Sequence, residues 1–314
     1  MINLTGKRIV ITGATGFIGR NVAAQLLAQG AEVFALVRLE SKNRDLLPVH
    51  ENLHEVSCCL ADVGRCVGEI GKADAFLHFA WSGVNREEID SPIVQATNIS
   101  GSLSCVRAAK ALGCQLFMDA GSRVEYGIQP DGVMSEDREC NPVNSYGRAK
   151  LEFYNQAVPM CAECGMTYYH LRFFSVYGTG DHPWSIISTL VRDLPLGEKV
   201  SLSACLHRWN FMHIEDAARA VVELYRFSDE HKGESRIVNV ASKDTRVLRE
   251  FAEEIYDLCE KNGELEFGTF VQAKEGALSI CPTVNVLEEL TGETWNEQVS
   301  FTDGIRGMLD VLRK

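Results

Sequence analysis

The sequence lacks any apolar run long enough to cross a membrane, and it lacks a net positive charge. No stretch approaches the roughly 20 consecutive apolar residues that a transmembrane helix needs. The 31 lysine and arginine residues are outnumbered by 43 aspartate and glutamate residues, which gives a formal net charge of -12. Because nucleic acids and anionic membrane surfaces attract basic proteins, this charge argues against both as partners.

Cysteine pairs with the spacing of a zinc knuckle or a redox motif are also missing. The eleven cysteines are an odd number and are scattered through periodic segments. Cys161 and Cys164 form a single C-A-E-C pattern, which falls on the last turn of an expected helix. The start of the chain, Ile2 to Arg8, is mostly polar and has no signal-peptide pattern. We therefore expect reduced thiols, no metal site and a cytoplasmic protein.

The segment from Lys7 to Gln29 indicates a strand, a tight turn and a helix. The β-branched residues Ile9 to Ile11 precede three glycines, and apolar residues at helical spacing follow them. Glycine at such a turn lets a pyrophosphate approach the backbone, where the free N–H groups and the positive end of the helix dipole would bind it. The pattern favours a dinucleotide ligand. The three glycines are Gly13, Gly16 and Gly19.

The rest of the first half alternates between apolar strands and helices. Strands that are apolar throughout and separated by helices predict a doubly wound parallel sheet in an α/β protein, with ligands at the carboxyl ends of the strands. The expected strands are 32–37, 55–60, 76–80, 116–120 and 167–173, and the main helices are 92–112 and 145–161.

The alternation becomes less regular beyond about residue 175. We expect residues 1–175 to form the dinucleotide-binding domain and residues 176–314 to form mainly a smaller mixed α/β substrate lobe. Within the second half, a helix at 215–225 and a strand at 237–240 predict that parts of 207–242 return to the sheet. The lobe itself is expected from 183–206 and 245–314.

Three side chains are candidates for acid–base chemistry. Tyr146 and Lys150 are four residues apart near the start of an expected helix, so they share one of its faces. A phenol is a poor acid or base at neutral pH until a nearby cation favours the phenolate, and Lys150 is placed to supply that charge. Ser122 follows an expected strand, where its hydroxyl could bind a substrate oxygen.

Several motifs in order carry a resemblance to a known family. They are T-G-A-T-G-F-I-G at 12–19, Asp62, H-F-A at 78–80, N-I-S-G-S at 98–102, G-S-R-V-E-Y-G at 121–127, N-P-V-N-S-Y-G-R-A-K at 141–150, L-R-F-F-S-V-Y-G at 171–178 and F-M-H-I-E-D at 211–216. The sequence resembles the extended short-chain dehydrogenase/reductases, in the branch of nucleotide-sugar epimerases, dehydratases and reductases. That resemblance implies a Rossmann-type sheet and a nucleotide-sugar substrate.

The resemblance also implies roles for individual residues. Ser122, Tyr146 and Lys150 match the family's catalytic triad, with Tyr146 as the general acid and base. The cofactor would contact Gly13, Thr15, Gly16, Phe17, Ile18, Gly19, Arg38, Lys42, Asp62, Val63, Ala80, Tyr146, Lys150 and Phe173. The sugar nucleotide would contact Trp81, Ser122, Arg123, Ser175 and Arg208.

Two departures from the family pattern bear on the choice of cofactor and on the type of reaction. Arg38 stands where members that prefer NAD carry an acidic residue, and Lys42 is close by, so we expect NADP(H) to be preferred, with NAD(H) possible. Val124 stands where 4,6-dehydratases carry a glutamate. Glu125 is one residue later and is expected on the opposite face, which argues against dehydration.

Together these features favour an NADP(H)-dependent reductase of a nucleotide-activated 4-keto sugar, with Tyr146 as the proton donor. The alternatives are a nucleotide-sugar epimerase with recycled NAD and a non-catalytic NAD(P)-binding sensor on the same fold. By resemblance, the helices at 92–112 and 145–161 would form the interface of a homodimer.

Overall fold

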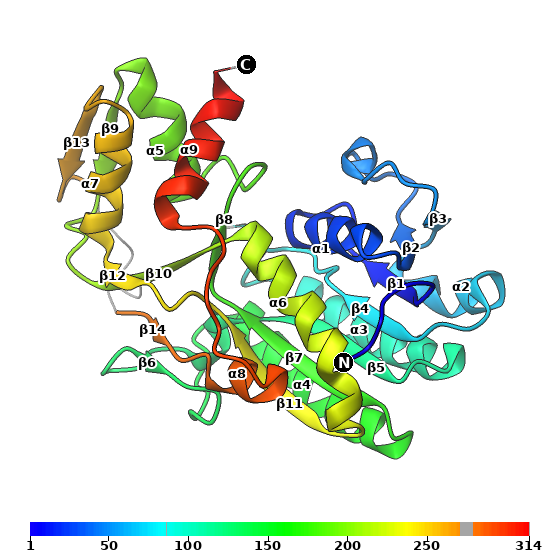
Figure 1. Ribbon diagram of the computed structural model, residues 1–314. Coiled ribbons are helices and arrows are strands. Elements are labelled where there is room, and N and C mark those ends of the chain that lie inside the picture. The colour runs from blue at the N-terminus through cyan, green and yellow to red at the C-terminus, as the bar shows by residue number, and fades with distance from the viewer. Residues whose placement is uncertain (86, 271–278, 314) are drawn as a thin grey trace.

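The computed structural model describes residues 1–85, 87–270 and 279–313. Its centre is a seven-stranded parallel sheet of order β11-β7-β5-β4-β1-β2-β3 (Figure 1). The predicted doubly wound α/β sheet is thereby confirmed. The strands are β1 (Arg8–Thr12), β2 (Glu32–Val37), β3 (Leu53–Ser57), β4 (Ala75–His78), β5 (Leu116–Ser122), β7 (Thr167–Phe173) and β11 (Ser235–Val240).

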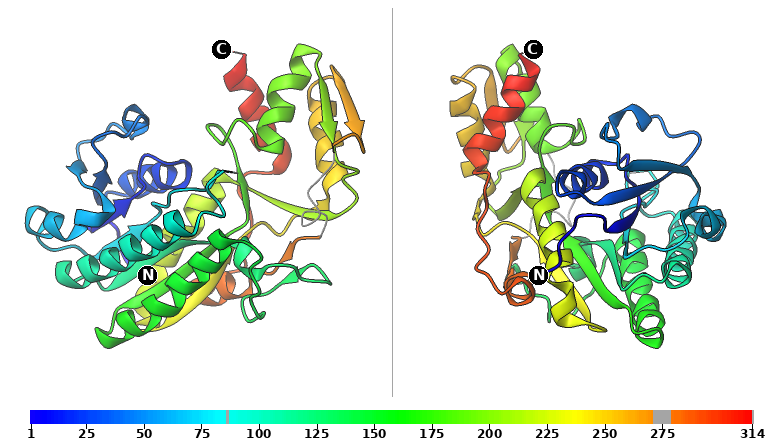
Figure 2. Two further views of the ribbon diagram at one scale, coloured as in Figure 1. Left: turned by 180° about the vertical axis from the view of Figure 1, so that it is seen from behind. Right: turned by 45° about the vertical axis from the view of Figure 1, so that its right-hand side comes forward.

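Helices cover both faces of the sheet, because successive strand residues point to opposite sides. Ile9 and Ile11 of β1 enter one apolar cluster and Val10 enters the other. The first cluster includes α1 (Phe17–Ala28), α6 (Ile214–Phe227) and α8 (Asn285–Thr291). The second includes α2 (Val63–Ile70), α3 (Pro92–Leu112) and α4 (Ser145–Glu163), and Figure 2 shows α3 and α4 side by side.

Two expected strands extend too far at their carboxyl ends. β3 ends at Ser57 rather than at residue 60, and β4 ends at His78 rather than at residue 80. Residues 58–61 and 79–82 instead leave the sheet and line a cleft at its carboxyl edge. Apolar composition extends the predicted strands, whereas the ladder hydrogen bonds end where the chain turns into the cleft.

A smaller lobe stands above the carboxyl edge of the sheet (Figure 1). Its apolar cluster joins α5 (Ile186–Asp193), β9 (Lys199–Leu202), α7 (Leu248–Leu258), β13 (Glu264–Phe267) and α9 (Phe301–Leu312). A three-stranded sheet of β12 (Thr245–Val247), β10 (Arg208–His213) and β8 (Ser175–Tyr177) connects the lobe to the main sheet, and β6 (Val133–Met134) pairs with β14 (Cys281–Pro282).

Parts of the second half pack on the main sheet. β11 pairs with β7, and α6 packs against α1. The segment around α8 differs from the expectation, since it lies against α6 and β11 rather than in the lobe. The reason is an apolar face on α8, where Leu287 and Leu290 are buried in the core of the sheet.

The eleven cysteines are all free thiols. In residues 1–85, 87–270 and 279–313, no helix has the length and apolar character that crossing a membrane requires. The same residues contain no cluster of three or more His, Cys, Asp or Glu side chains arranged to hold a metal ion.

Candidate active site

The glycine turn between β1 and α1 has the geometry of an anion cradle. Gly13 has a φ of +71°, and a Cβ there would lie 2.6 Å from the backbone nitrogen of Ala80. Gly16 is the N-cap of α1 and supplies no side-chain acceptor, so none covers the amides of the first turn. A Cβ on Gly19 would collide with the carbonyl oxygen of Gly13. The free amides and the helix dipole suit a diphosphate.

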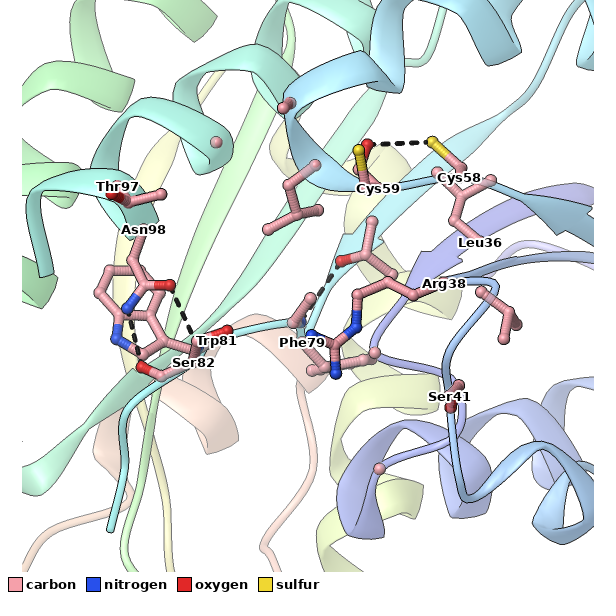
Figure 3. A pocket seen from close by; sticks show the side chains of 18 of the residues that line it. Leu36, Arg38, Ser41, Cys58, Cys59, Phe79, Trp81, Ser82, Thr97 and Asn98 are labelled. Carbon is pink, nitrogen blue, oxygen red and sulfur yellow. Dashed lines mark hydrogen bonds between the residues drawn. The ribbon is translucent and has the colours of Figure 1, made fainter. Parts of the chain in front are cut away.

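A cleft of about 1230 Å³ opens beside this turn, at the carboxyl ends of β1, β2, β3 and β4. Its volume exceeds the roughly 300–1,000 Å³ of ordinary small-molecule pockets and suits an extended ligand. Figure 3 shows Arg38 and Ser41 at one end and Trp81, Ser82 and Asn98 at the other. The lining includes the expected residues Gly13, Thr15, Gly16, Arg38, Lys42, Ala80 and Trp81.

One end of the cleft carries two cations. Arg38 and Lys42 are exposed, and the side chain of neither makes a hydrogen bond or ion pair with the part of the chain that the structure describes. Ser41 donates a hydrogen bond to the hydroxyl of Thr15, 3.2 Å between oxygens, which ties this loop to the glycine turn. Glu40 also lines the cleft, so the end has one acidic group beside its two basic ones.

The three candidate catalytic residues come from α4 and from the end of β5. Asn144 caps α4, and its side chain accepts a hydrogen bond from the amide of Gly147 at 2.8 Å. Lys150 is buried and donates from Nζ to the carbonyl oxygen of Ala120 at 2.5 Å. Ser122 is the last residue of β5, and its side chain lies close enough to the phenol of Tyr146 to lower the pKa of that phenol.

The electrostatics of Tyr146 differ from the sequence-based expectation. Burial raises the pKa of its phenol to about 12, although the side chain of Ser122 acts in the opposite direction. Burial also lowers the pKa of the Lys150 ammonium to about 8, against the opposing effect of Asp119 and Glu125. The Lys150 Nζ lies 5.7 Å from the centre of the Tyr146 ring. Burial therefore outweighs the lysine, and a cation brought by a ligand is needed to favour the phenolate.

A second group of side chains lies on the lobe side of Ser122. The guanidinium of Arg123 lies 4.9 Å from the centre of the Trp209 ring. The indole Nε1 of Trp209 donates to the hydroxyl of Ser175 at 3.0 Å. Arg208 is exposed at the start of β10 and donates to the carbonyl oxygen of Thr245. None of these four residues lines the dinucleotide-sized cleft.

Other expected contact residues also lie outside the lining of that cleft. Phe17, Ile18 and Gly19 begin α1, and Phe173 packs its ring 6.4 Å from that of Phe79. Asp62 is exposed and pairs with Arg65, while Val63 is buried in the core. The residues that line the cleft at this position are instead Cys58, Cys59, Leu60 and Ala61, of which the first three had been assigned to a strand.

Glu125 points away from the cleft, but the reason differs from the one that we expected. It lies in a short 3-10 turn, Arg123–Tyr126, rather than on an extended segment. Its carboxylate accepts the backbone N–H of Ser122 at 2.6 Å and contacts the buried side chains of His170 and Arg172. Sequence reasoning missed this cluster, although the polar residues at alternate positions of an otherwise apolar strand were a sign of it.

The fold and site together define an NAD(P)-dependent enzyme of the extended short-chain dehydrogenase/reductase type. A doubly wound sheet carries a glycine turn at its carboxyl edge, and Tyr146 and Lys150 adjoin one end of the cleft through Trp81. The chain belongs to the NAD dependent epimerase/dehydratase family, whose profile matches residues 9–241.

Similar proteins include sugar-nucleotide enzymes. A UDP-glucose 4-epimerase of Corynebacterium glutamicum is 26% identical over 266 residues, which cover 78% of each chain. The dTDP-D-glucose 4,6-dehydratase of Mus musculus is 24% identical over 98% of this chain and 89% of its own. Two further UDP-glucose 4-epimerases, of Lactobacillus helveticus and Azospirillum brasilense, are matched over only about half of their lengths, 52% and 49%.

The structure of MoeE5 in complex with UDP-glucuronic acid and NAD is similar to this chain at a TM-score of 0.82 and 25% identity. The match covers 98% of this chain and 99% of MoeE5. The resemblance to the extended short-chain dehydrogenase/reductases stated from the motifs is therefore confirmed.

Proposed function

We propose that the protein is a nucleotide-sugar epimerase that recycles a bound nicotinamide dinucleotide. The observation that carries the proposal is the set Ser122, Tyr146 and Lys150 beside a cleft with a glycine turn. The epimerase of C. glutamicum and the NAD-containing MoeE5 complex favour this reaction over the reductase that the sequence favoured first. Net reduction of a keto sugar remains the second candidate because Arg38 favours NADP(H) as the cofactor.

The chain's own residues have distinct tasks in this reaction. The turn at Gly13 and Gly16 and the first amides of α1 would hold the cofactor's diphosphate. When bound, the cofactor would supply the acceptor and donor of a hydride. Tyr146 would take the proton of the sugar hydroxyl and return it after the ring has presented its other face, while Ser122 holds the same oxygen by a hydrogen bond.

The form of the dinucleotide is a separate part of the proposal. Arg38 and Lys42 line the cleft and have no anionic partner among the residues that the structure describes. A guanidinium binds a phosphate in a bidentate pair, so we expect the 2′-phosphate of NADP(H) to be preferred. Glu40 on the same loop opposes that preference, and NAD(H) is the form present in MoeE5.

The substrate would lie between the main sheet and the lobe. Trp81 adjoins Tyr146 and Lys150, and Arg123 with its Trp209 partner provides a cation beside these residues. Because MoeE5 binds UDP-glucuronic acid, we expect a UDP-linked sugar, with Arg123 and Arg208 near its anionic groups and Ser175 at the floor of the site.

A direct assay separates the candidates. Purified protein is incubated with UDP-glucose, UDP-glucuronic acid or UDP-N-acetylglucosamine and a trace of NAD or NADP, and products are separated by chromatography. An epimerase forms the epimer with no net change in nicotinamide absorbance. In a parallel incubation with a 4-keto sugar nucleotide and NADPH, a reductase consumes NADPH in proportion to product. A sensor does neither while still binding the dinucleotide.

Two further expectations stay proposals. We expect a homodimer through α3 and α4, whose neighbouring positions on one side of the sheet would form a four-helix interface with a second copy. A mass of one chain by light scattering with cofactor present would contradict it. We also expect the protein in the cytoplasm, where nicotinamide dinucleotides and sugar nucleotides are found and thiols stay reduced.

A further inference from the structure

A chain of buried charged side chains lies directly behind the catalytic serine. The Oε1 of Glu125 accepts the backbone N–H of Ser122 at 2.6 Å. The other carboxylate oxygen, Oε2, contacts the Nε2 of His170 at 2.8 Å and accepts from the Nε of Arg172 at 3.0 Å. The backbone of Ser122 is therefore connected to β7 through the carboxylate of Glu125.

The chain continues across the imidazole. The Nδ1 of His170 lies 2.9 and 3.1 Å from the two carboxylate oxygens of Asp119. The Tyr168 hydroxyl donates to one of them, Oδ1, at 2.8 Å. Asp119 directly precedes Ala120, whose carbonyl oxygen accepts from the ammonium of Lys150. One run of contacts thus links the backbone at Ser122 with the backbone that holds the catalytic lysine.

The arrangement is closed to solvent and leaves no space for other side chains. Asp119, Glu125 and His170 are exposed by 1% or less. A Cβ on Gly121 would lie 2.5 Å from the Nε2 of His170 and 2.9 Å from the Oε1 of Glu125, so only glycine admits both groups. Buried charges are costly unless they are paired, and here each has a partner of opposite charge.

We propose that Glu125, His170 and Asp119 form a positioning relay, in which a doubly protonated imidazole between two carboxylates fixes Ser122 and supports the charged state of Lys150. The inference rests on the proposed catalytic role of these two residues and deepens it. It also assigns Glu125 a task that is distinct from acid–base work on the sugar, since its side chain does not reach the cleft.

The charges around the relay agree with this assignment. Burial alone would lower the pKa of His170, but the carboxylates of Asp119 and Glu125 raise it to about 9. Burial would raise the pKa of Glu125, but His170 and Arg172 bring it to about 2. Both carboxylates also raise the pKa of Lys150, which burial lowers.

The other ionisable neighbours add little charge at neutral pH. Burial lowers the pKa of His78 to about 3 and raises that of Tyr146 to about 12, so both are neutral. The ring of Tyr154 packs 5.0 Å from that of His170, and burial raises the pKa of its phenol. Removing one carboxylate therefore leaves Lys150 harder to protonate.

The test replaces Glu125 with glutamine in the full-length protein loaded with its cofactor. In Glu125→Gln we expect kcat to fall by about 10- to 100-fold, because Ser122 loses its fixed position, while KM stays within about threefold. The alkaline limb of the kcat profile should move down by about one pH unit, as Lys150 loses a negative neighbour. Asp119→Asn should move the same limb with a smaller loss of kcat.

The matched control is Glu136→Gln. Glu136 is half-buried and accepts hydrogen bonds from Thr283 and the amide of Asn239, but it touches neither Ser122 nor His170. It should lose stability and keep the wild-type pH profile. An unchanged alkaline limb in both Glu125→Gln and Asp119→Asn would overturn the relay and leave the carboxylates with a purely structural role.

A second measurement on the wild-type protein guards against variants that do not fold. Nitrogen-15 NMR of histidine-labelled protein should show both ring nitrogens of His170 protonated at pH 7.5, with the signal assigned by its loss in His170→Gln. A neutral imidazole at that pH would reject the relay. If the wild type binds cofactor but turns over no nucleotide sugar, the proposed function fails, whereas the NMR result still decides the protonation state of the relay.

Discussion

The ammonium nitrogen of Lys150 lies 3.5 Å from the centre of the Trp81 indole. Trp81 is fixed there by a hydrogen bond from its Nε1 to Gln95 at 2.9 Å, and its ring meets that of Tyr146 edge-on at 6.2 Å. This candidate catalytic lysine is thus held between an aromatic face and a backbone carbonyl. Neither group neutralises a charge, although both stabilise the protonated form.

The burial of Lys150 predicts a pH-dependent stability of the cofactor-free protein. Its folded pKa of about 8 lies below the ordinary 10.5, so between these values the folded state has released a proton that the unfolded state retains. Burying the charge therefore destabilises the fold below pH 8, and this cost is relieved as the pH rises toward 10.5. Relative to Lys150→Met, the wild type should gain at most about 3 kcal/mol across the window.

Urea unfolding at pH 7.5 and pH 10 measures this gain. Lys110→Met is the control, because the side chain of Lys110 is 55% exposed on α3, and its unfolding free energy should run parallel to that of the wild type. A difference between wild type and Lys150→Met that is the same at both pH values would show that the folded protein does not depress the pKa of this lysine.

Removal of the Tyr146 hydroxyl should abolish turnover without loss of the cofactor. Tyr146→Phe keeps the ring against Trp81 but leaves no group to move the proton, so we expect kcat to fall by about 10²- to 10⁴-fold. Dinucleotide affinity, followed by fluorescence, should change little. Tyr256→Phe in α7 provides the control and should be fully active. Full activity of Tyr146→Phe would instead favour a non-catalytic sensor.

A charge reversal at Arg38 should change the choice of dinucleotide. Because a guanidinium–phosphate pair contributes about 1.5–3 kcal/mol, Arg38→Glu should weaken NADP binding by about 10- to 100-fold. NAD binding should stay the same or improve. Arg65→Glu reverses a charge on α2 outside the cleft and should alter neither affinity. Calorimetric titration of both dinucleotides measures the ratio, and an unchanged ratio in Arg38→Glu would leave the choice to other residues.

The sequence predicted those features that depend on residues close together in the chain. The strand, glycine turn and helix around Gly13 are local, and Tyr146 and Lys150 share a helix face by their spacing alone. The relay was not predictable in this way, since His170 is 45 residues from Glu125 and 51 from Asp119. Its one local sign is the row Tyr168, His170 and Arg172 on one face of β7, polar groups that burial obliges to find partners.

The sequence also misjudged effects that arise only on folding. The cation of Lys150 was expected to favour the phenolate of Tyr146, but close packing removes water from both groups, and burial becomes the larger effect on each. Asp62 shows that folding also decides which residues reach the cleft. It follows an apolar run as the family pattern requires, yet that strand ends early, and residues 58–61 reach the cleft in its place.

The glycines of α1 and α2 should respond in opposite ways to alanine. At Gly19 a Cβ would collide with the carbonyl oxygen of Gly13, so Gly19→Ala must push the helix away from the turn. We expect a loss of about 1–3 kcal/mol in unfolding free energy and a weaker hold on the dinucleotide. At Gly64 no atom lies within 4 Å of the added carbon, and Gly64→Ala should gain about 0.4–1 kcal/mol because the unfolded chain loses freedom.

Thermal unfolding with and without dinucleotide distinguishes the two effects. Ligand binding should raise the midpoint of the wild type and of Gly64→Ala by the same amount, and that of Gly19→Ala by much less. If Gly19→Ala lost stability yet kept the full ligand-induced shift, the turn would not be the diphosphate site. The amides of Gly16 and Phe17 at the start of the helix would then have moved without any effect on binding.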